Sequence, residues 1–194
     1  MAVTLNETPS GNRLHIGIFG KTNSGKSSFI NTFSGQKVSI VADVAGTTTD
    51  PVYKSMEIYP LGPCVLIDTA GFDDEGELGA LRIEKTSLAA QKTELAIILF
   101  CEDEMVQELK WYNYFKKRQT PVIPVLGKAD LYTQEQKEYL IQMIQKNTGE
   151  TVCPVSSETG EGIRKLKELL AEKIPEGYGN RMITGFPKMI WYSL

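Results

Sequence analysis

The stretch Gly20-Lys21-Thr22-Asn23-Ser24-Gly25-Lys26-Ser27 follows a short apolar run at 14–19 and opens an amphipathic segment at 25–34. It matches the pattern G-x-x-x-x-G-K-S, in which glycines let backbone N–H groups surround a phosphate. The apolar run predicts a buried strand and the segment after it a helix, which is the context that this pattern requires. The sequence therefore predicts a phosphate-binding loop between the first strand and the first helix.

Each polar group of this loop has an expected role. Backbone N–H groups of residues 21–27 would surround a β-phosphate, favoured by the field at the helix N-terminus. The ammonium of Lys26 would bridge β- and γ-phosphate oxygens, and the Ser27 hydroxyl would bind Mg²⁺. The expected nucleotide-binding residues here are Gly20, Asn23, Ser24, Gly25, Lys26, Ser27 and Ser28.

Strand-like and helix-like segments alternate along the rest of the chain. Strands are expected at 14–19, 52–58, 64–67, 95–100, 122–126 and 151–155, with 52–58 at an edge. Helices are expected at 25–34, 77–92, 104–117, 133–147 and 162–173. This order predicts a doubly wound, mostly parallel six-stranded α/β sheet with helices on both faces and a ligand at the carboxyl ends of its strands.

The chain divides into three expected parts. Residues 1–13 predict a flexible lead, and 14–174 a single nucleotide-binding domain. The tail at 175–194 leaves the alternating pattern, and three interpretations stay open: a docking segment, the start of a missing domain, or a remnant of truncation.

Bulk composition narrows the function classes. The chain is 41% hydrophobic and 23% charged, as is typical of soluble globular proteins, and its formal net charge of −3 gives no reason to expect nucleic acid or membrane as a partner. No apolar run approaches the roughly 20 residues that span a bilayer, and no signal peptide is evident, so we expect a cytoplasmic protein.

The chain has three cysteines that lie far apart, Cys64, Cys101 and Cys153, and a single histidine, His15. They predict buried thiols and no iron–sulfur cluster on this chain.

A second motif, Asp68-Thr69-Ala70-Gly71, follows the strand at 64–67. A carboxylate at the carboxyl end of a strand suits contact with Mg²⁺ through water, so Asp68 is expected near the metal. The N–H of Gly71 would then contact the γ-phosphate. D-x-x-G alone is a weak signal, but its strand, order and spacing agree with the phosphate loop.

Two further motifs predict recognition of guanine. Asp130 in Gly127-Lys128-Ala129-Asp130 can accept both N1–H and N2–H₂ of guanine, which adenine does not offer, while Lys128 would lay its apolar stem over the base. Gly127 replaces the asparagine of the usual N-K-x-D, which predicts weaker affinity. Ser156-Ser157-Glu158 is a degenerate form of S-A-K, whose backbone N–H meets guanine O6. Together the motifs predict GTP or GDP with Mg²⁺ rather than ATP.

The segment at 41–50 predicts a switch. Thr48, or alternatively Thr47, would complete the coordination of Mg²⁺ when the γ-phosphate is present. Phe72 stands where many small GTPases place a water-orienting glutamine. Asn23 with a G-T-T switch resembles the potassium-activated GTPases of the tRNA-modifying class, which implies that Asn23 helps to hold K⁺ as a source of charge stabilisation. The expected catalytic groups are Lys26, Asn23, Thr48 and Gly71. The candidates for positioning water stay open among Asp73, Asp74, Glu75 and Glu77.

Three stretches, at 11–20, 46–57 and 61–79, resemble the GTPase domain of HydF, the FeFe-hydrogenase maturation factor. The resemblance spans about 5–174 and implies slow GTP hydrolysis that regulates contact with the maturases HydE and HydG. It also implies that later domains of that family are absent here, leaving a monomer or weak dimer. Two alternatives stay open: a nucleotide-gated binding module with negligible hydrolysis, and a related RNA-linked GTPase.

Overall fold

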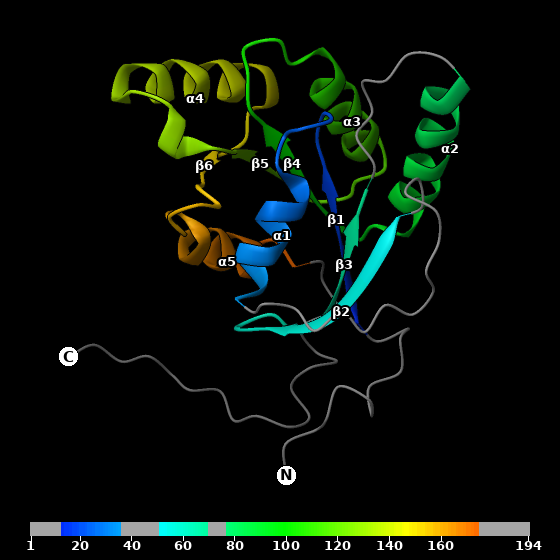
Figure 1. Ribbon diagram of the computed structural model, residues 1–194. Helices are drawn as coiled ribbons and strands as arrows, with labels where there is room; N and C mark the ends of the chain where they lie inside the picture. The colour runs from blue at the N-terminus through cyan, green and yellow to red at the C-terminus, as the bar shows by residue number, and fades with distance from the viewer. Residues whose placement is uncertain (1–12, 36–50, 70–76, 175–194) are drawn as a thin grey trace, which may run out of the picture.

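The computed structural model describes residues 13–35, 51–69 and 77–174, with side chains in the last range from Lys85 onward. These residues form a sheet between two layers of helices (Figure 1). The strands are β1 (Leu14–Phe19), β2 (Val52–Ile58), β3 (Gly62–Asp68), β4 (Leu95–Phe100), β5 (Val122–Leu126) and β6 (Cys153–Pro154). The helices are α1 (Lys26–Ser34), α2 (Glu77–Lys92), α3 (Val106–Lys117), the 3₁₀ helix η2 (Ala129–Leu131), α4 (Gln134–Thr148) and α5 (Ile163–Glu172).

The sheet has six strands in the order β2-β3-β1-β4-β5-β6. All neighbouring pairs are parallel except β2 and β3, which form an antiparallel hairpin at one edge. The predicted doubly wound, mostly parallel sheet is confirmed. β1 lies between β3 and β4. The chain places β3 on one side of β1 and then crosses to place β4 on the other side, so the direction of winding reverses at β1. Open α/β sheets bind ligands at such a point, beyond the carboxyl ends of their strands.

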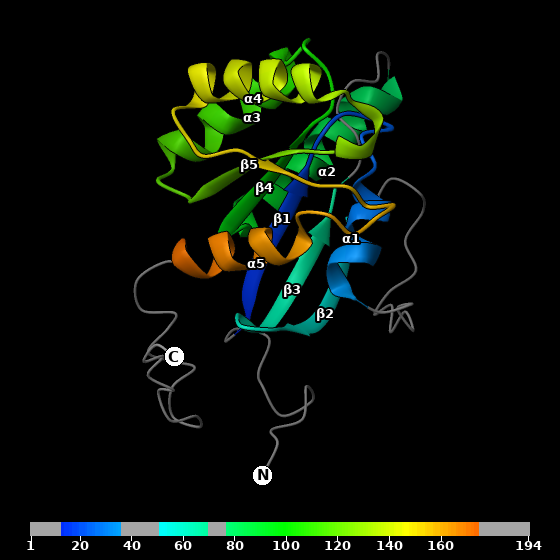
Figure 2. The same cartoon turned by 90° about the vertical axis from the view of Figure 1, so that its left-hand side faces the viewer.

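Alternating side chains of the central strand β4 separate two cores. Leu95, Ile97 and Leu99 face a cluster that includes residues of α1 and α5. Ala96 and Ile98, on the opposite face, join a cluster that includes residues of α2, α3 and α4. Strand side chains alternate with a period of two, so a continuously apolar strand must be covered on both faces. Figure 2 shows α1 and α5 on one side of the sheet and α3 and α4 on the other.

Element boundaries differ from the predicted ones mainly at β6. The predicted strand at 151–155 is reduced to two residues, which pair with Val125 and Leu126 of β5. Pro154 has no N–H to donate, which limits the ladder. β3 begins two residues before the predicted strand at 64–67, because Gly62 already pairs with Ile58. In the described parts of the chain no helix is long and apolar enough to cross a bilayer.

Candidate functional site

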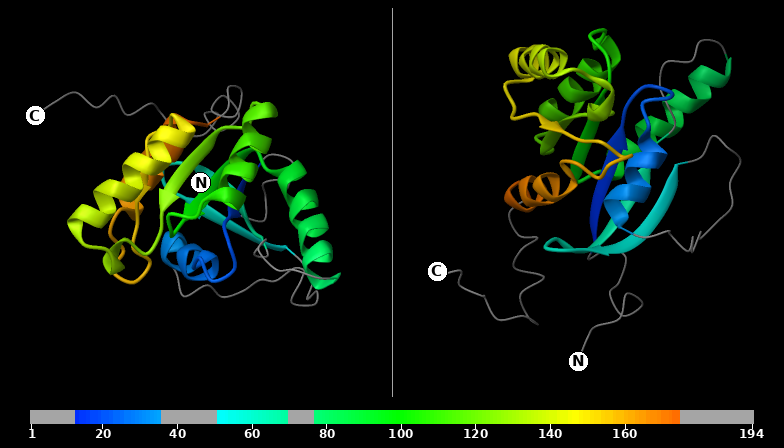
Figure 3. Two further views of the ribbon diagram at one scale, coloured as in Figure 1. Left: turned by 90° about the horizontal axis from the view of Figure 1, so that it is seen from above. Right: turned by 60° about the vertical axis from the view of Figure 1, so that its left-hand side comes forward.

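The phosphate-loop sequence forms a tight turn between β1 and α1, seen in two further orientations in Figure 3. Asn23 and Gly25 both adopt left-handed backbone conformations, with φ of 60° and 87°. Gly20 has no room for a side chain, since a Cβ there would lie 2.7 Å from Ser24 Oγ and 3.1 Å from the Leu99 carbonyl oxygen. The glycines are therefore required by the curvature of the loop and by its close approach to β4.

Lys26 lies within the curve of this loop and is only 8% exposed. Its ammonium donates hydrogen bonds to the carbonyl oxygens of Gly20 (2.8 Å) and Lys21 (2.6 Å). A buried ammonium must be surrounded by acceptors, and here the loop itself supplies two of them. This arrangement places a fixed positive charge beside the N-terminus of α1, where an anion is favoured.

Ser27 and Asp68 come together from the start of α1 and the end of β3. The Ser27 hydroxyl donates to Asp68 Oδ2 at 3.1 Å. Burial raises the pKa of Asp68, against the opposing influence of the Ser27 hydrogen bond and of Lys54 and Lys26. Two neighbouring oxygen ligands, one from a carboxylate, are the donor set that Mg²⁺ prefers. The pair predicted from separate motifs thus fits a magnesium ion.

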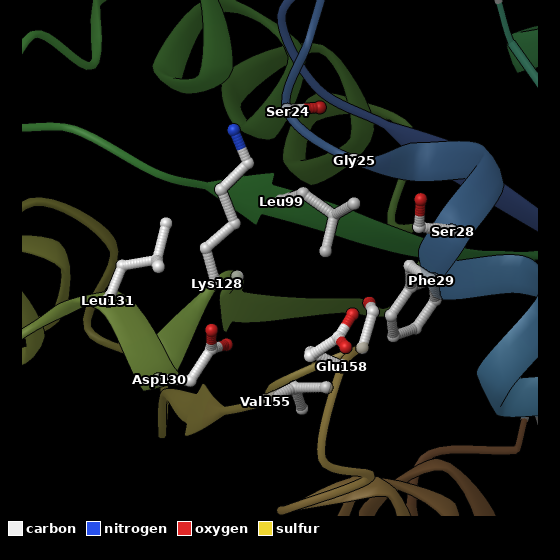
Figure 4. A pocket seen from close by; sticks show the side chains of 12 residues that line it. Ser24, Gly25, Ser28, Phe29, Leu99, Lys128, Asp130, Leu131, Val155 and Glu158 are labelled. Atoms are coloured by element: carbon white, nitrogen blue, oxygen red, sulfur yellow. The ribbon is translucent and has the colours of Figure 1, made fainter.

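The base-recognition motifs line a pocket of about 220 Å³. Its lining residues are Ser24, Gly25, Ser28, Phe29, Leu99, Gly127, Lys128, Asp130, Leu131, Val155, Ser157 and Glu158. Figure 4 shows Lys128, Asp130 and Leu131 along one side of the pocket, with Ser28 and Phe29 of α1 opposite. The pocket therefore joins the phosphate loop to the segments after β5 and β6, and combines apolar walls with carboxylates at its rim.

Lys128 connects the two ends of the site. Its backbone is left-handed, with φ of 53°. Its Cε lies 3.8 Å from the position that a Cβ on Gly25 would take, so the side-chain stem runs from the base-recognition segment toward the phosphate loop. Asp130, two residues later in η2, is exposed. The Asp130 carboxylate is therefore accessible at the pocket and able to accept hydrogen bonds from a ligand.

Ser156 and Ser157 occupy different places, although both were predicted to contact the nucleotide. Ser157 lines the pocket. Ser156 is fully buried, and its hydroxyl accepts a hydrogen bond from the N–H of Thr159. Its own N–H donates to the carbonyl oxygen of Glu161. Ser156 thus shapes the turn that presents Ser157 and is not among the residues that line the pocket.

Thr47, Thr48, Gly71 and Phe72 lie outside the described residues, as do Asp73, Asp74 and Glu75; for Glu77 only the backbone is described. The predictions made for them therefore stay predictions.

Several contacts that hold the site together have no signal in the sequence. Thr32 of α1 donates to the carbonyl oxygen of Ser157 at 2.7 Å, across 125 positions. Lys21 donates to the carbonyl oxygen of Glu104 at 2.5 Å, across 83 positions. The Cys101 thiol donates to a carbonyl of the phosphate loop. The first contact joins α1 to the segment after β6, and the other two join loops that meet only because parallel strands end at the same edge of the sheet.

Comparison with known families agrees with this geometry. Residues 15–128 match the family described as 50S ribosome-binding GTPase. The chain belongs to this family. It is therefore a P-loop GTPase domain, and membership of the 50S ribosome-binding GTPase family implies GTP or GDP and Mg²⁺ as ligands. The predicted fold and the predicted membership of a GTPase family are confirmed.

Individual relatives in the family carry several names. The chain is 35% identical to the GTPase Der of Wolinella succinogenes over 189 residues, covering 93% of this chain and 39% of that protein. It is 35% identical to the tRNA modification GTPase MnmE of Aliarcobacter butzleri over 153 residues, covering 74% of this chain and 33% of that protein. The chain thus spans about two fifths or less of the length of these relatives.

Solved structures of Era share the fold. Aquifex aeolicus Era bound to GDP and AlF₄⁻ superposes with a TM-score of 0.67 at 26% identity, covering 84% of this chain and 57% of that one. Era in complex with MgGDPNP and nucleotides of 16S ribosomal RNA superposes with a TM-score of 0.68 at 25% identity, covering 91% of this chain and 60% of that one. None of these four relatives is named for hydrogenase maturation.

Proposed function

We propose that this domain is the GTP-driven switch of an FeFe-hydrogenase maturation protein, acting in the cytoplasm and stimulated by potassium ions. The observation that carries the nucleotide part is the meeting of the phosphate loop, the Ser27–Asp68 pair and the Lys128–Asp130 segment at one edge of the sheet. The maturation part is supported by the resemblance of the stretches at 11–20, 46–57 and 61–79 to HydF.

The proposed roles follow from the chemistry of each group. Lys26 exchanges a loop carbonyl for phosphate oxygens, and Asp130 accepts the N1–H and N2–H₂ of guanine under the stem of Lys128. Mg²⁺ would be held by the Ser27 hydroxyl and, through water, by Asp68, and it supplies neutralisation of charge on the β- and γ-phosphates. The full proposed nucleotide set is Gly20, Asn23, Ser24, Gly25, Lys26, Ser27, Ser28, Lys128, Asp130 and Ser157, with Ser156 shaping the turn that carries Ser157. Thr48 and Gly71 are proposed to sense the γ-phosphate.

Potassium is proposed to bind beside Asn23. The Asn23 side chain is exposed, and its backbone adopts the left-handed conformation. The test compares GTP hydrolysis in KCl and in NaCl. We expect faster hydrolysis in KCl for the unaltered chain, loss of that difference in Asn23→Ala, and its retention in Asn113→Ala, which alters an exposed asparagine of α3. Equal rates in the two salts would remove potassium from the mechanism.

The maturation role is tested with the full-length protein and the maturases HydE and HydG. We expect their affinity for it to differ between the GDP state and a state bound to a non-hydrolysable GTP analogue. Hydrogenase activity in co-expressing cells should fall when Lys26 is replaced. Equal partner affinity in both nucleotide states, with unchanged hydrogenase activity, would contradict the proposal. Nucleotide-dependent affinity without measurable hydrolysis would instead favour a binding module.

A second candidate is an RNA-linked GTPase. It is favoured by the relatives, one of which is named for tRNA modification, while an Era structure contains 16S ribosomal RNA. The net charge of −3 gives this chain no general attraction to phosphate backbones. Binding of labelled tRNA or 16S RNA to the full-length protein at physiological salt would favour this second candidate, and no binding would remove it.

A further inference from the structure

Gly127 occupies a position where a side chain would reach the phosphate loop. A Cβ built on Gly127 lies 3.2 Å from Cys101 Sγ and 3.8 Å from the carbonyl oxygen of Ser24. The asparagine of the usual N-K-x-D pattern would therefore extend toward that carbonyl. In this chain the space in front of Gly127 is taken by the thiol of Cys101.

The Cys101 thiol makes the contact that Gly127 cannot make. It lies directly after β4 and donates to the Ser24 carbonyl oxygen at 3.3 Å. Burial raises the pKa of Cys101 to about 11, so the group is a protonated donor at neutral pH. The Ser24 carbonyl belongs to the part of the phosphate loop that precedes Gly25 and Lys26. Fixing it restrains the loop at the residues that face the nucleotide.

Cys101 is itself held in place by the base-recognition segment. The Tyr132 hydroxyl, just after η2, donates to the carbonyl oxygen of Cys101. The N–H of Gly127 donates to the carbonyl oxygen of Phe100 at 2.9 Å. The end of β4 is thus connected to the base-recognition segment by two hydrogen bonds and to the phosphate loop by a third. A rigid link between the two halves of the site lowers the entropic cost of ordering these loops when the nucleotide binds.

We propose that Cys101 is a positioning residue for the nucleotide, and that Cys101 and Gly127 form a compensating pair in which the thiol braces Ser24 in place of a side chain at position 127. The inference rests on the assignment of the nucleotide to this site and is independent of the hydrogenase maturation role. It implies that a thiol at 101 and an asparagine at 127 compete for the same space. A contact of 3.2 Å between Cβ and Sγ already requires the sulfur to move.

The test is a double-mutant cycle on GDP affinity, measured by fluorescence of methylanthraniloyl-GDP with Mg²⁺ present. Cys101→Ala, which removes the donor, is expected to raise the Kd for GDP roughly three- to tenfold. Cys101→Ser keeps a donor and is expected to stay within about twofold of the unaltered chain. Gly127→Asn alone is expected to bring no gain, because its Cβ would lie 3.2 Å from Cys101 Sγ and the sulfur would have to shift. Combined with Cys101→Ala, it is expected to restore the lost affinity.

Two controls separate bracing from general loss of packing. Cys64→Ala removes another buried thiol, in β3, and is expected to leave the Kd for GDP unchanged. Cys101→Val fills the space of the thiol with methyl groups but lacks the donor, so it is expected to weaken GDP binding as Cys101→Ala does. Thermal unfolding of each variant verifies that it is folded, and Cys101→Val alone tests the loss of the donor if Cys101→Ala does not fold.

The proposal is overturned if Cys101→Val binds GDP as tightly as the unaltered chain. It is also overturned if adding Gly127→Asn to Cys101→Ala brings no recovery. Asp130→Asn in the same assay keeps the two assignments distinct. Unchanged GDP affinity in Asp130→Asn would show that the pocket is not the guanine site. Unchanged GDP affinity in the Cys101 variants alone would contradict only the positioning role of Cys101.

Discussion

Replacing Asp130 with asparagine is expected to change which base the pocket prefers. A carboxylate accepts two hydrogen bonds from the N1–H and N2–H₂ of guanine, whereas an amide offers one acceptor and one donor. The donor of the asparagine would face the N2–H₂ group of guanine, which is also a donor. Xanthine carries a carbonyl in that place, so its N1–H and carbonyl oxygen match the amide.

The size of the effect follows from the position of Asp130. Hydrogen bonds to a charged group contribute about 1.5–3 kcal/mol each when desolvated. Asp130 is exposed at the rim of the pocket, so the lower end of that range applies to the bond with N2–H₂ that the substitution removes, and a similar penalty applies to the two donors left facing each other. The expected loss is about 3 kcal/mol, or roughly a 100-fold increase in the Kd for GDP. Affinity for xanthosine diphosphate is expected to rise instead.

The assay is competition of GDP and xanthosine diphosphate against a fluorescent nucleotide for the unaltered chain and for Asp130→Asn. Glu135→Gln is the matched control, since it removes one negative charge from an exposed residue in the first turn of α4. It is expected to leave both affinities unchanged. If Asp130→Asn lost affinity for both nucleotides equally, the bidentate contact with guanine would be the wrong reading of this residue.

Three further outcomes are expected. Ser27→Ala removes one oxygen ligand, so a Mg²⁺ titration of GDP binding should shift to higher concentration while affinity in excess chelator stays the same. Burial acts to raise the pKa of Glu150, but hydrogen bonds from Lys116 and Lys173 outweigh it and hold that pKa below its ordinary value of 4.5. Glu150→Gln should therefore lower the free energy of unfolding by about 1 kcal/mol above that pH, with the difference vanishing as pH falls through the folded-state pKa in urea titrations. Ile97→Ala, at a position with 0% exposure in the central strand, should lower it by about 2–5 kcal/mol, measured the same way.

Most of the fold could be predicted because its signals are local. The residues of β4 are all apolar, and such a run between two helix-like segments has to be a strand covered on both faces. The capping box at Thr133 and Gln136 marks the start of α4 within one turn. Predictions were weaker for β6, because its two residues depend on pairing with β5 and carry little pattern of their own.

The site was predicted in its parts but not in its connections. Asp68 and Ser27 were assigned to one metal from separate motifs, and the structure brings them within 3.1 Å. Ser156 was expected to contact the nucleotide, yet its hydroxyl is used inside its own turn. A motif specifies which residue types a loop contains, whereas packing decides which of them face the ligand.

The phosphate loop was determined by the sequence alone, because its glycines, its lysine and the strand–helix context all lie within about 20 consecutive residues. For Gly127, the sequence alone indicated only that the asparagine side chain of the usual N-K-x-D pattern is missing. The tertiary structure places the Cys101 thiol against that glycine and within hydrogen-bonding distance of Ser24, residues separated by 26 and 77 positions from Cys101. Contacts between the ends of parallel strands depend on sheet order and register, which neighbouring residues in the sequence do not encode.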